Sequence, residues 1–380
     1  MNTKSLCCFI AITGAFLTGC NSAPEKGDGS ITMEDCDGYQ LTVCDIASVH
    51  DTVTLPLSEL VEDCKLIRFE NTDTALFKFS GIAITDKHIA IRNSRGAVKL
   101  FDHDGKFLCD VGNYGQGPGE YQTLYDALID EKGKCIYLAP FHGYTKILKY
   151  DMNGRYLDAI DFGEELNKPK LALEPDGTLS LVHLCFKGMS EFMAAHVAAD
   201  GTITKYIPAE NMKTETVDNK GYFVAYNNEI WAYRNVPGLT FMAMPVDTLY
   251  RYNVKKNELE PRFTLQKSGS GEKPFCIYNE LPDYYFGILW NIGTILVDKK
   301  KNTSHYLGIA NDYFGNMEAP LNFQDGWFFA MYEPGTLMDK IETALSKGGL
   351  SEQDREKLNS LLSSIDENDN NLLFLGKLKK

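Results

Sequence analysis

Apolar and polar residues alternate along most of this chain in short runs, and turn residues separate the runs. In residues 98–111, two such runs flank the turn Asp102-His103-Asp104-Gly105, which predicts a β-hairpin. The same pattern returns at 147–162 and, more weakly, at 194–207. The glycines of these turns, Gly105, Gly154 and Gly201, lie 49 and 47 residues apart. A period of this length with four short strands in each repeat predicts a β-propeller.

Six repeats of this kind account for residues 64–377, so we expect an all-β protein, a six-bladed β-propeller of four-stranded antiparallel blades. The runs expected to form the fourth blade are 222–226, 230–233, 247–252 and 261–265, and the fifth blade is expected to begin at 284–290. The sixth blade is split between 321–332 and 371–377. A propeller closes when an N-terminal strand joins the last blade, so we expect residues 64–69 beside residues 372–377.

Helical periodicity interrupts the sixth blade and predicts a two-helix insert at 336–365. In the first helix, Leu337, Ile341 and Leu345 share one face, and Gly348-Gly349 ends it. Ser351 is the expected N-cap of the second helix, with Asp354 at the capping-box position. The apolar face of the second helix consists of Leu358, Leu361, Leu362 and Ile365.

The N-terminus has the pattern of a bacterial lipoprotein signal. Lys4 precedes a short apolar run at 6–17, and Leu17-Thr18-Gly19-Cys20 matches a lipobox, in which the cysteine thiol is acylated. We therefore expect a signal peptide at 1–19, a lipid-anchored tether at 20–39 and the propeller at 40–380, beginning with an extended arm at 40–60. The lipid on Cys20 would attach the protein to a membrane of the cell envelope, with the outer membrane favoured and the orientation open. The alternative is an ordinary signal peptide with a chance cysteine.

Composition narrows the classes of partner. The formal net charge is −14, which argues against nucleic acid as a partner. The short basic runs Lys168-Pro169-Lys170 and 299–301 have the appearance of solvated turns. We expect a monomer.

The ten cysteines show no CxxC and no metal-ligand spacing, so we expect neither a metal nor another cofactor. Cys109, Cys135 and Cys185 fall inside strand patterns and are expected to be buried free thiols. A disulfide among Cys36, Cys44 and Cys64 remains open.

Two motifs favour turns over ligand sites. Residues 115–121, GQGPGEY, are rich in glycine, but strands are expected on both sides, whereas a phosphate-binding loop precedes a helix. We therefore interpret this segment as a tight connection between blades, with Glu120 and Tyr121 attaching it to the next blade. Asp102, Asp104 and Asp151 could suggest calcium, but they are interpreted as residues of hairpin turns.

The connections between blade strands divide the candidate residues by face. We denote the strands of a blade a to d from the axis to the rim. The short Asp-Gly turns join a to b or c to d, whereas the longer b–c loops should gather at the opposite channel mouth. Candidate ligand-binding residues in these loops are Arg92, Arg95, His142, Tyr144, His183, Lys187, Tyr233 and Arg234. Arg92, His142, His183 and Arg234 are expected to converge on an anionic or carbohydrate-like ligand.

The lipobox Cys20, the Asp-x-x-Gly-Lys-Phe-Leu hairpin, GQGPGEY and the helices before 369–373 together resemble a family of six-bladed β-propeller lipoproteins of diderm bacteria with NHL-like blades. The resemblance covers residues 20–380 and implies the fold and an envelope location. It assigns no activity, and Asn371 stands where the family usually has proline. We predict a lipid-anchored propeller that binds a small molecule, glycan or protein through the b–c face. The alternatives are a hydrolase or lyase, for which no catalytic residue is assigned, and a structural or signalling subunit that docks through the helical insert.

Overall fold

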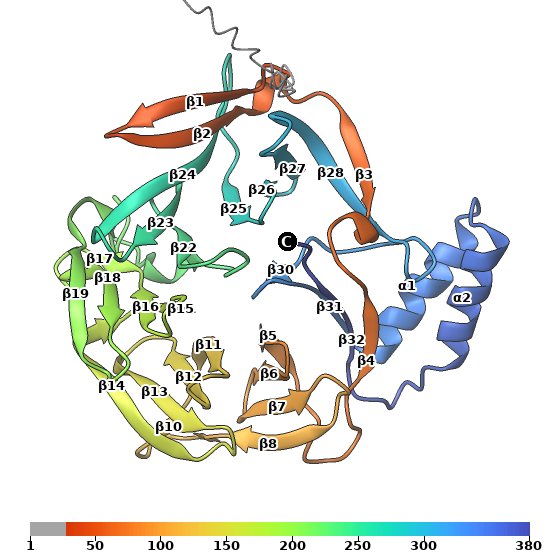
Figure 1. Cartoon of the computed structure of the whole chain (residues 1–380), viewed down its shortest axis with the longest axis horizontal. Helices are drawn as coiled ribbons and strands as arrows, with labels where there is room; N and C mark the ends of the chain where they lie inside the picture. The colour runs from red at the N-terminus through yellow and green to blue at the C-terminus, as the bar shows by residue number, and fades with distance from the viewer. Residues whose placement is uncertain (1–27) are drawn as a thin grey trace, which may run out of the picture.

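The computed structural model describes residues 28–380, which form a ring of six β-sheet blades (Figure 1). The lipobox and Cys20 lie outside these residues. The six-bladed propeller predicted from the sequence is confirmed.

The strands of the first three blades are, from axis to rim, β5 (Phe79–Ile84), β6 (His88–Asn93), β7 (Val98–Asp102) and β8 (Phe107–Val111) in blade 1; β11 (Leu124–Asp130), β12 (Cys135–Pro140), β13 (Tyr144–Asp151) and β14 (Tyr156–Leu166) in blade 2; and β15 (Lys170–Leu173), β16 (Leu179–Val182), β18 (Phe192–Val197) and β19 (Ile203–Pro208) in blade 3.

The remaining blades consist of β21 (Ile230–Trp231), β22 (Thr240–Ala243), β23 (Leu249–Asn253) and β24 (Glu258–Gln266) in blade 4; β25 (Cys276–Glu280), β26 (Tyr284–Leu289), β27 (Gly293–Asp298) and β28 (Thr303–Asn311) in blade 5; and β30 (Phe323–Gln324), β31 (Trp327–Tyr332), β32 (Leu372–Lys377) and β4 (Lys65–Arg68) in blade 6. Smaller elements are β9 (Asn113–Tyr114), β10 (Glu120–Tyr121), β17 (Cys185–Phe186), β20 (Lys213–Thr214), β29 (Met317–Glu318) and the 3-10 turns Ile46–Ser48, Leu57–Glu59, Glu210–Met212 and Ala225–Asn227.

Ring closure follows the prediction. β4, from the N-terminal part of the chain, pairs antiparallel with β32, with Arg68 opposite Leu372. The last blade therefore contains strands from both ends of the chain, and its outermost strand precedes blade 1 in sequence.

The N-terminal arm contributes more strands than expected. β2 (Tyr39–Asp45) pairs parallel with β24, and β3 (Thr52–Pro56) pairs parallel with β28, so both lie on the rim (Figure 1). β1 (Ile31–Cys36) forms a hairpin with β2 through the left-handed residues Asp37 and Gly38. Residues 31–36 were expected in the tether but form a strand. Only Ile31 and Met33 alternate in this segment, and Ile31 alone is buried, so the apolar pattern was too short to predict a strand.

For the fourth and fifth blades, the sequence assigned some strands to the wrong segments. Residues 222–226 do not form the first strand of blade 4, because β21 has that place, and β22 lies inside the stretch 233–245 that was expected to be a loop. In blade 5 the first strand, β25, was missed. A long connection at 209–229 between β19 and β21 displaces the expected period.

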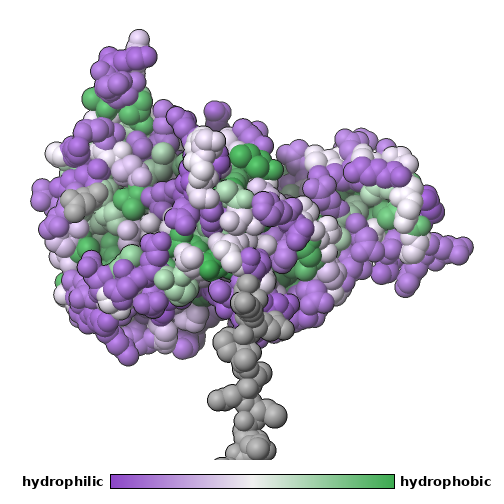
Figure 2. Space-filling model, turned by 90° about the horizontal axis from the view of Figure 1, so that it is seen from above, coloured by the Kyte–Doolittle hydropathy of each residue, from purple (hydrophilic) through white to green (hydrophobic). Residues whose placement is uncertain are grey.

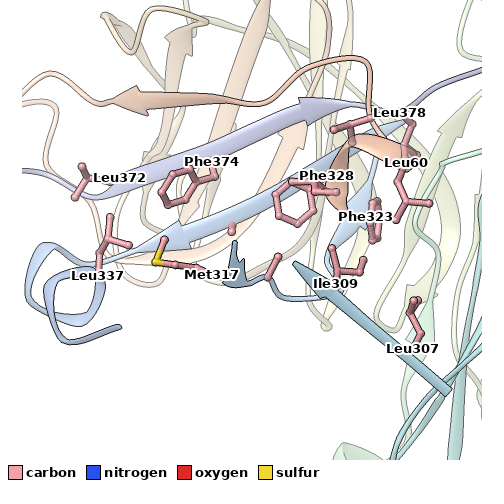
Figure 3. Close-up of a cluster of buried hydrophobic side chains, with 14 of the residues drawn as sticks. Leu60, Leu307, Ile309, Met317, Phe323, Phe328, Leu337, Leu372, Phe374 and Leu378 are labelled. Carbon is pink, nitrogen blue, oxygen red and sulfur yellow. The ribbon is translucent and has the colours of Figure 1, made fainter. Parts of the chain in front are cut away.

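The helical insert packs against blade 6. α1 (Pro334–Ser346) and α2 (Glu352–Ser363) bury Leu337, Ile341, Leu358 and Leu361. Leu337 lies beside Met317 and Leu372 in the cluster of Figure 3. Ser351 caps α2 by accepting a hydrogen bond from the Asp354 amide, as predicted.

The cysteines among residues 28–380 are all free thiols. The open question of a disulfide in the N-terminal segment is settled for Cys36 and Cys44 by strand register, since they lie at opposite ends of the β1–β2 hairpin, paired with Tyr39 and Ile31. A disulfide needs Cα atoms about 5.5 Å apart, which this register forbids. Cys135 and Cys185 are buried, as predicted, whereas Cys109 is half-buried.

The connection from blade 1 to blade 2 has the predicted structural role. β9 and β10 pair around it, and the Gly117 amide donates to Glu120 Oε2 at 2.8 Å. Tyr121, however, binds the preceding blade, because its hydroxyl lies 2.6 Å from Val111 O and 2.8 Å from Val98 N. Tyr150 supplies the contact from blade 2 by donating to Gly119 O.

The hairpin-turn interpretation of the aspartates also holds. Asp102 Oδ1 accepts from the amides of Asp104 and Lys106, and Asp151 Oδ1 accepts from those of Asn153 and Arg155. These carboxylates are therefore occupied by the backbone of their own turns.

Candidate functional site

The antiparallel order of the strands defines two faces of the ring. Strand a of each blade starts at the face that carries the b–c loops, which we call the b–c face, and ends at the opposite face. Side chains near the start of strand a or the end of strand b therefore gather at the b–c mouth of the channel. Asp126, Lys170 and Arg92 are such residues.

Arg92 lies at this mouth, as predicted. Its Nη1 donates to the carbonyls of Leu124 and Tyr125 at 3.0 and 2.6 Å, which joins blade 1 to the first strand of blade 2. The guanidinium lies across Gly81, where an added Cβ would be 2.0 Å from Nη2. Burial lowers the pKa of Arg92, and its Nε is buried without a partner among the described residues.

Arg234 enters the channel from the opposite face, which corrects the expectation that it belongs to a b–c loop. It follows β21, so it belongs to the a–b connection of blade 4, and a connection beside β22 projects into the ring (Figure 1). Its Nη1 lies 2.6 Å from Asp126 Oδ2 and its Nε 2.5 Å from Asp325 Oδ1. Although burial disfavours the charged guanidinium, the two carboxylates raise its pKa overall.

Backbone contacts complete this ion-paired plug, which we define as Arg234 with Asp126 and Asp325. Arg234 has a left-handed backbone with φ +57°, and its Nη1 also donates to Leu171 O. Asp126 accepts from the Leu171 amide of blade 3, and Asp325 accepts from the Ile84 amide of blade 1. Since two carboxylates and two carbonyls from different blades already bind its guanidinium, we assign Arg234 a structural role that ties blades together across the axis.

His183 is also excluded from the channel mouth. Its side chain has no exposed surface, its Nε2 donates to Phe192 O at 2.8 Å, and its Nδ1 accepts from the Asn167 amide at 3.4 Å. Burial lowers the pKa of His183 to about 4. It is a neutral core residue, which its position at the end of a strand did not reveal.

The other predicted residues are spread over the face. His142, Arg95 and Lys187 are exposed, and Lys187 forms an ion pair with Glu215. Tyr144 is half-buried at the start of β13. Tyr233 precedes Arg234 in the a–b connection of blade 4, and burial raises the pKa of its hydroxyl. Of the four residues expected to converge, only Arg92 and Arg234 are near enough for the charge of one to lower the pKa of the other, whereas His142 lies elsewhere on the face and His183 is in the core.

A cavity of about 140 Å³ opens between blades 2 and 3. Its lining is mostly apolar and consists of Phe141, His142, Glu165, Asn167, Lys168, Leu184, Phe186, Met189, Thr216, Phe223 and Ala225. The b–c loops of blades 2 and 3, the connection between β14 and β15, and the long connection 209–229 form its walls. Asn167 is 8% exposed, and its Nδ2 has no hydrogen-bond partner among the described residues.

Sequence reasoning missed two lysines at the start of strand a in blade 3. Lys168, expected in a solvated turn, is 4% exposed, donates to Asn228 O at 2.5 Å and is paired with Glu229. Lys170 lies with its Nζ 4.5 Å from the ring centre of Tyr125, and burial lowers its pKa to about 8. Both lysines come directly before the apolar run of β15, where strand a begins at the b–c mouth. This position in the sequence could have indicated that they lie at the channel mouth.

These features define a class of protein: a six-bladed β-propeller with an ion-paired plug in its channel and a cavity on one face. No helix within residues 28–380 is long and apolar enough to cross a membrane.

The chain belongs to the family described as "Domain of unknown function (DUF4934)", whose model matches residues 41–377. No curated protein matches it in sequence. Among solved structures it is similar to a "Putative exported protein" from Bacteroides fragilis, with 17% identity and a TM-score of 0.60 over 87% of this chain and 99% of that one.

More distant similarities are to a dihydro-heme d1 dehydrogenase (13% identity, TM-score 0.38, 73% of this chain and 54% of that one) and to a virginiamycin B lyase from Staphylococcus aureus (14%, 0.35, 62% and 74%). At these values, neither similarity informs the function of this chain.

Proposed function

We propose that this protein is a lipid-anchored propeller of the cell envelope that binds a ligand in the cavity between blades 2 and 3. The cavity lies on the b–c face, where propellers usually bind ligands, and is built from two of the long loops that the sequence singled out. The lipobox supports the anchor, and the similarity to a protein described as exported is compatible with this location.

The observation that carries this proposal is the combination of an apolar cavity with an unpartnered amide. A cavity of about 150 Å³ in another protein accommodates benzene, so a volume of about 140 Å³ suits one aromatic ring or a branched aliphatic group. A buried amide without a partner costs free energy, and a ligand that accepts a hydrogen bond from Asn167 Nδ2 would remove that cost.

Two exposed apolar side chains that line the cavity indicate that a ligand could extend beyond it. Met189 is 50% exposed and Phe223 is 61% exposed at the opening. Elsewhere the visible surface is mostly hydrophilic, with hydrophobic residues in small patches (Figure 2). Exposed apolar side chains around an opening are typical of a binding site.

The two alternative functions have less support. Asp126 and Asp325 are both bound by Arg234 and by backbone amides, so their main contacts stabilise the fold. The helical insert directs Leu337, Ile341, Leu358 and Leu361 into blade 6, so its main apolar face is already covered.

Filling the cavity tests the proposal. Ala225, a buried lining residue in the 3-10 turn Ala225–Asn227, should become an obstruction in Ala225→Leu. The matched control is Ala47→Leu, at an exposed position of the 3-10 turn Ile46–Ser48. We expect indole and benzyl alcohol to raise the melting temperature of the native chain and of Ala47→Leu, but not of Ala225→Leu. No response in the native chain, or an equal response in all three, would refute the cavity as the site.

A further inference from the structure

The b–c mouth of the channel holds more positive than negative side chains. Arg92, Lys168 and Lys170 lie there with Asp126 and Glu229, and Arg234 with Asp325 reaches them from the opposite face, which leaves one positive charge without a carboxylate among these groups. Lys168 is paired with Glu229, and Arg234 is paired with both aspartates. Arg92 and Lys170 are therefore the cations that are short of counter-charge.

Both of these cations also have unused hydrogen-bonding capacity. Lys170 Nζ makes no hydrogen bond with any residue of 28–380, and its close contact is the face of the Tyr125 ring at 4.5 Å. Arg92 uses Nη1 for two carbonyls, and its Nε has no partner in the described chain. Both residues are only partly buried, so a ligand can approach them, and cations with unused donors suit an acceptor that carries charge.

Neighbouring residues also determine where the two cations lie. Gly81 lies opposite Arg92 in the β5–β6 ladder, and any larger residue there would collide with the guanidinium. Tyr125 fixes the position of Lys170, while its own hydroxyl contacts Glu229 and lies 2.9 Å from Ile230 O. The two cations are thus held by elements of blades 1, 2 and 3.

We propose that Arg92 and Lys170 bind a carboxylate group at the b–c mouth of the channel. One carboxylate supplies the one negative charge that the mouth lacks, and its two oxygens can accept from a guanidinium and an ammonium together. The carboxylate could belong to a free organic acid, an acidic sugar or the C-terminus of a peptide. This site is separate from the cavity between blades 2 and 3, because neither cation lines that cavity.

The site predicts a pH dependence. Burial lowers the pKa of Lys170 to about 8, while Asp126 and Glu229 act to raise it and Arg92 and Arg234 lower it further. The ammonium form is the one that binds a carboxylate. Affinity should therefore fall as the pH rises above about 8, by up to tenfold per pH unit, and the bound carboxylate should in turn raise the pKa of Lys170.

The test uses the full chain with sodium acetate as the probe, at constant ionic strength maintained with sodium chloride. Lys170→Met removes the ammonium without breaking a hydrogen bond of the native fold. The control is Lys146→Met, since Lys146 is an exposed lysine of β13 that pairs with Asp161 at 3.4 Å. We expect calorimetry to show acetate binding about 10- to 100-fold weaker in Lys170→Met and unchanged in Lys146→Met. Absence of binding to the native chain, or equal binding by Lys170→Met, would overturn the proposal.

Two further probes distinguish the sources of the carboxylate. Glucuronate represents an acidic sugar, and a short peptide compared with its C-terminal amide represents a peptide terminus. Tighter binding of one probe than of acetate identifies its class. Equal binding of glucuronate, free peptide and acetate, with none for the amide, would mean that the mouth recognises the carboxylate alone, which also supports the proposal.

Discussion

At the scale of single residues, the environment of a side chain in this propeller differs from what its neighbours in sequence suggest. Lys168 has the composition of a turn around it, yet it is buried because strand a of blade 3 begins beside it and directs it toward Glu229. His183 follows a strand and was expected at the surface, but the b–c loop of blade 3 encloses it. The charge and type of these two residues were readable in the sequence, whereas the burial of their polar side chains was not.

His183 predicts a specific pH dependence of stability. Its pKa is about 4 in the folded chain and near 6.5 when unfolded, so between these values the unfolded state binds the proton first. Neutral His183 therefore contributes stability fully above pH 6.5, and this contribution, about 3 kcal/mol at most, is lost as the pH falls toward 4. Glu164 Oε1 lies 3.6 Å from His183 Nε2, and burial raises the pKa of Glu164, so this carboxyl gives little compensation in this range. Cys185, a further titratable neighbour, has its thiol 3.4 Å from His183 O.

Urea unfolding of the native chain and of His183→Gln at several pH values measures this effect. The native chain should be the more stable at pH 7.5, and its advantage should shrink as the pH falls from 6.5 to 4. Other titrating groups are the same in both chains and cancel in the difference. A difference that does not change with pH would contradict a neutral buried His183.

At the scale of elements, turns and hairpins were the most predictable part of the chain. Asp-Gly turns form through contacts within a few residues, such as Asp102 Oδ1 with the Lys106 amide, so the sequence contains everything that determines them. The prediction of blade 4 was wrong because the first strands of this blade are short and a long connection precedes them. β21 has only two residues, and periodicity cannot identify so short a strand.

The blade 1 to blade 2 connection gives a prediction at this scale. Gly119 has φ +72°, and a Cβ there would lie 2.4 Å from Tyr156 Cγ, so Gly119→Ala should lower the free energy of unfolding by more than about 1 kcal/mol. Gly117→Ala is the matched control, since its Cβ would meet only the flexible Glu120 carboxylate at 3.0 Å. Guanidinium unfolding should show the larger loss for Gly119→Ala, with indole binding kept. Lost indole binding at unchanged stability would make the loop part of the site instead.

At the scale of the whole molecule, the two ends of the described chain hold the ring together. β4 closes blade 6, while β2 and β3 add parallel strands to the rims of blades 4 and 5. The plug adds a contact across the axis, because Arg234 of blade 4 binds carboxylates from blades 2 and 6. The ring is therefore closed at its rim and also tied through its centre.

Membrane attachment is the prediction that concerns the whole protein. Cys20→Ser should move the chain from the membrane fraction to the soluble fraction and abolish labelling with a fatty acid, because the thioether to the lipid can no longer form. Cys36→Ser, at a free thiol of β1, is the control and should remain in the membrane fraction. Retention of the unlabelled Cys20→Ser protein would contradict the lipoprotein assignment.

The sequence by itself determined the number of blades, the hairpin turns, the helical insert and the strand that closes the ring. These depend on alternation and turn chemistry within short segments, which act in the same way wherever the segment lies. Only the tertiary structure decided which side chains face the channel. The charges of Arg92 and Arg234 act on Lys170 because blades far apart in sequence share one axis, and Arg234 reaches the channel from the opposite face because it follows the first strand of blade 4.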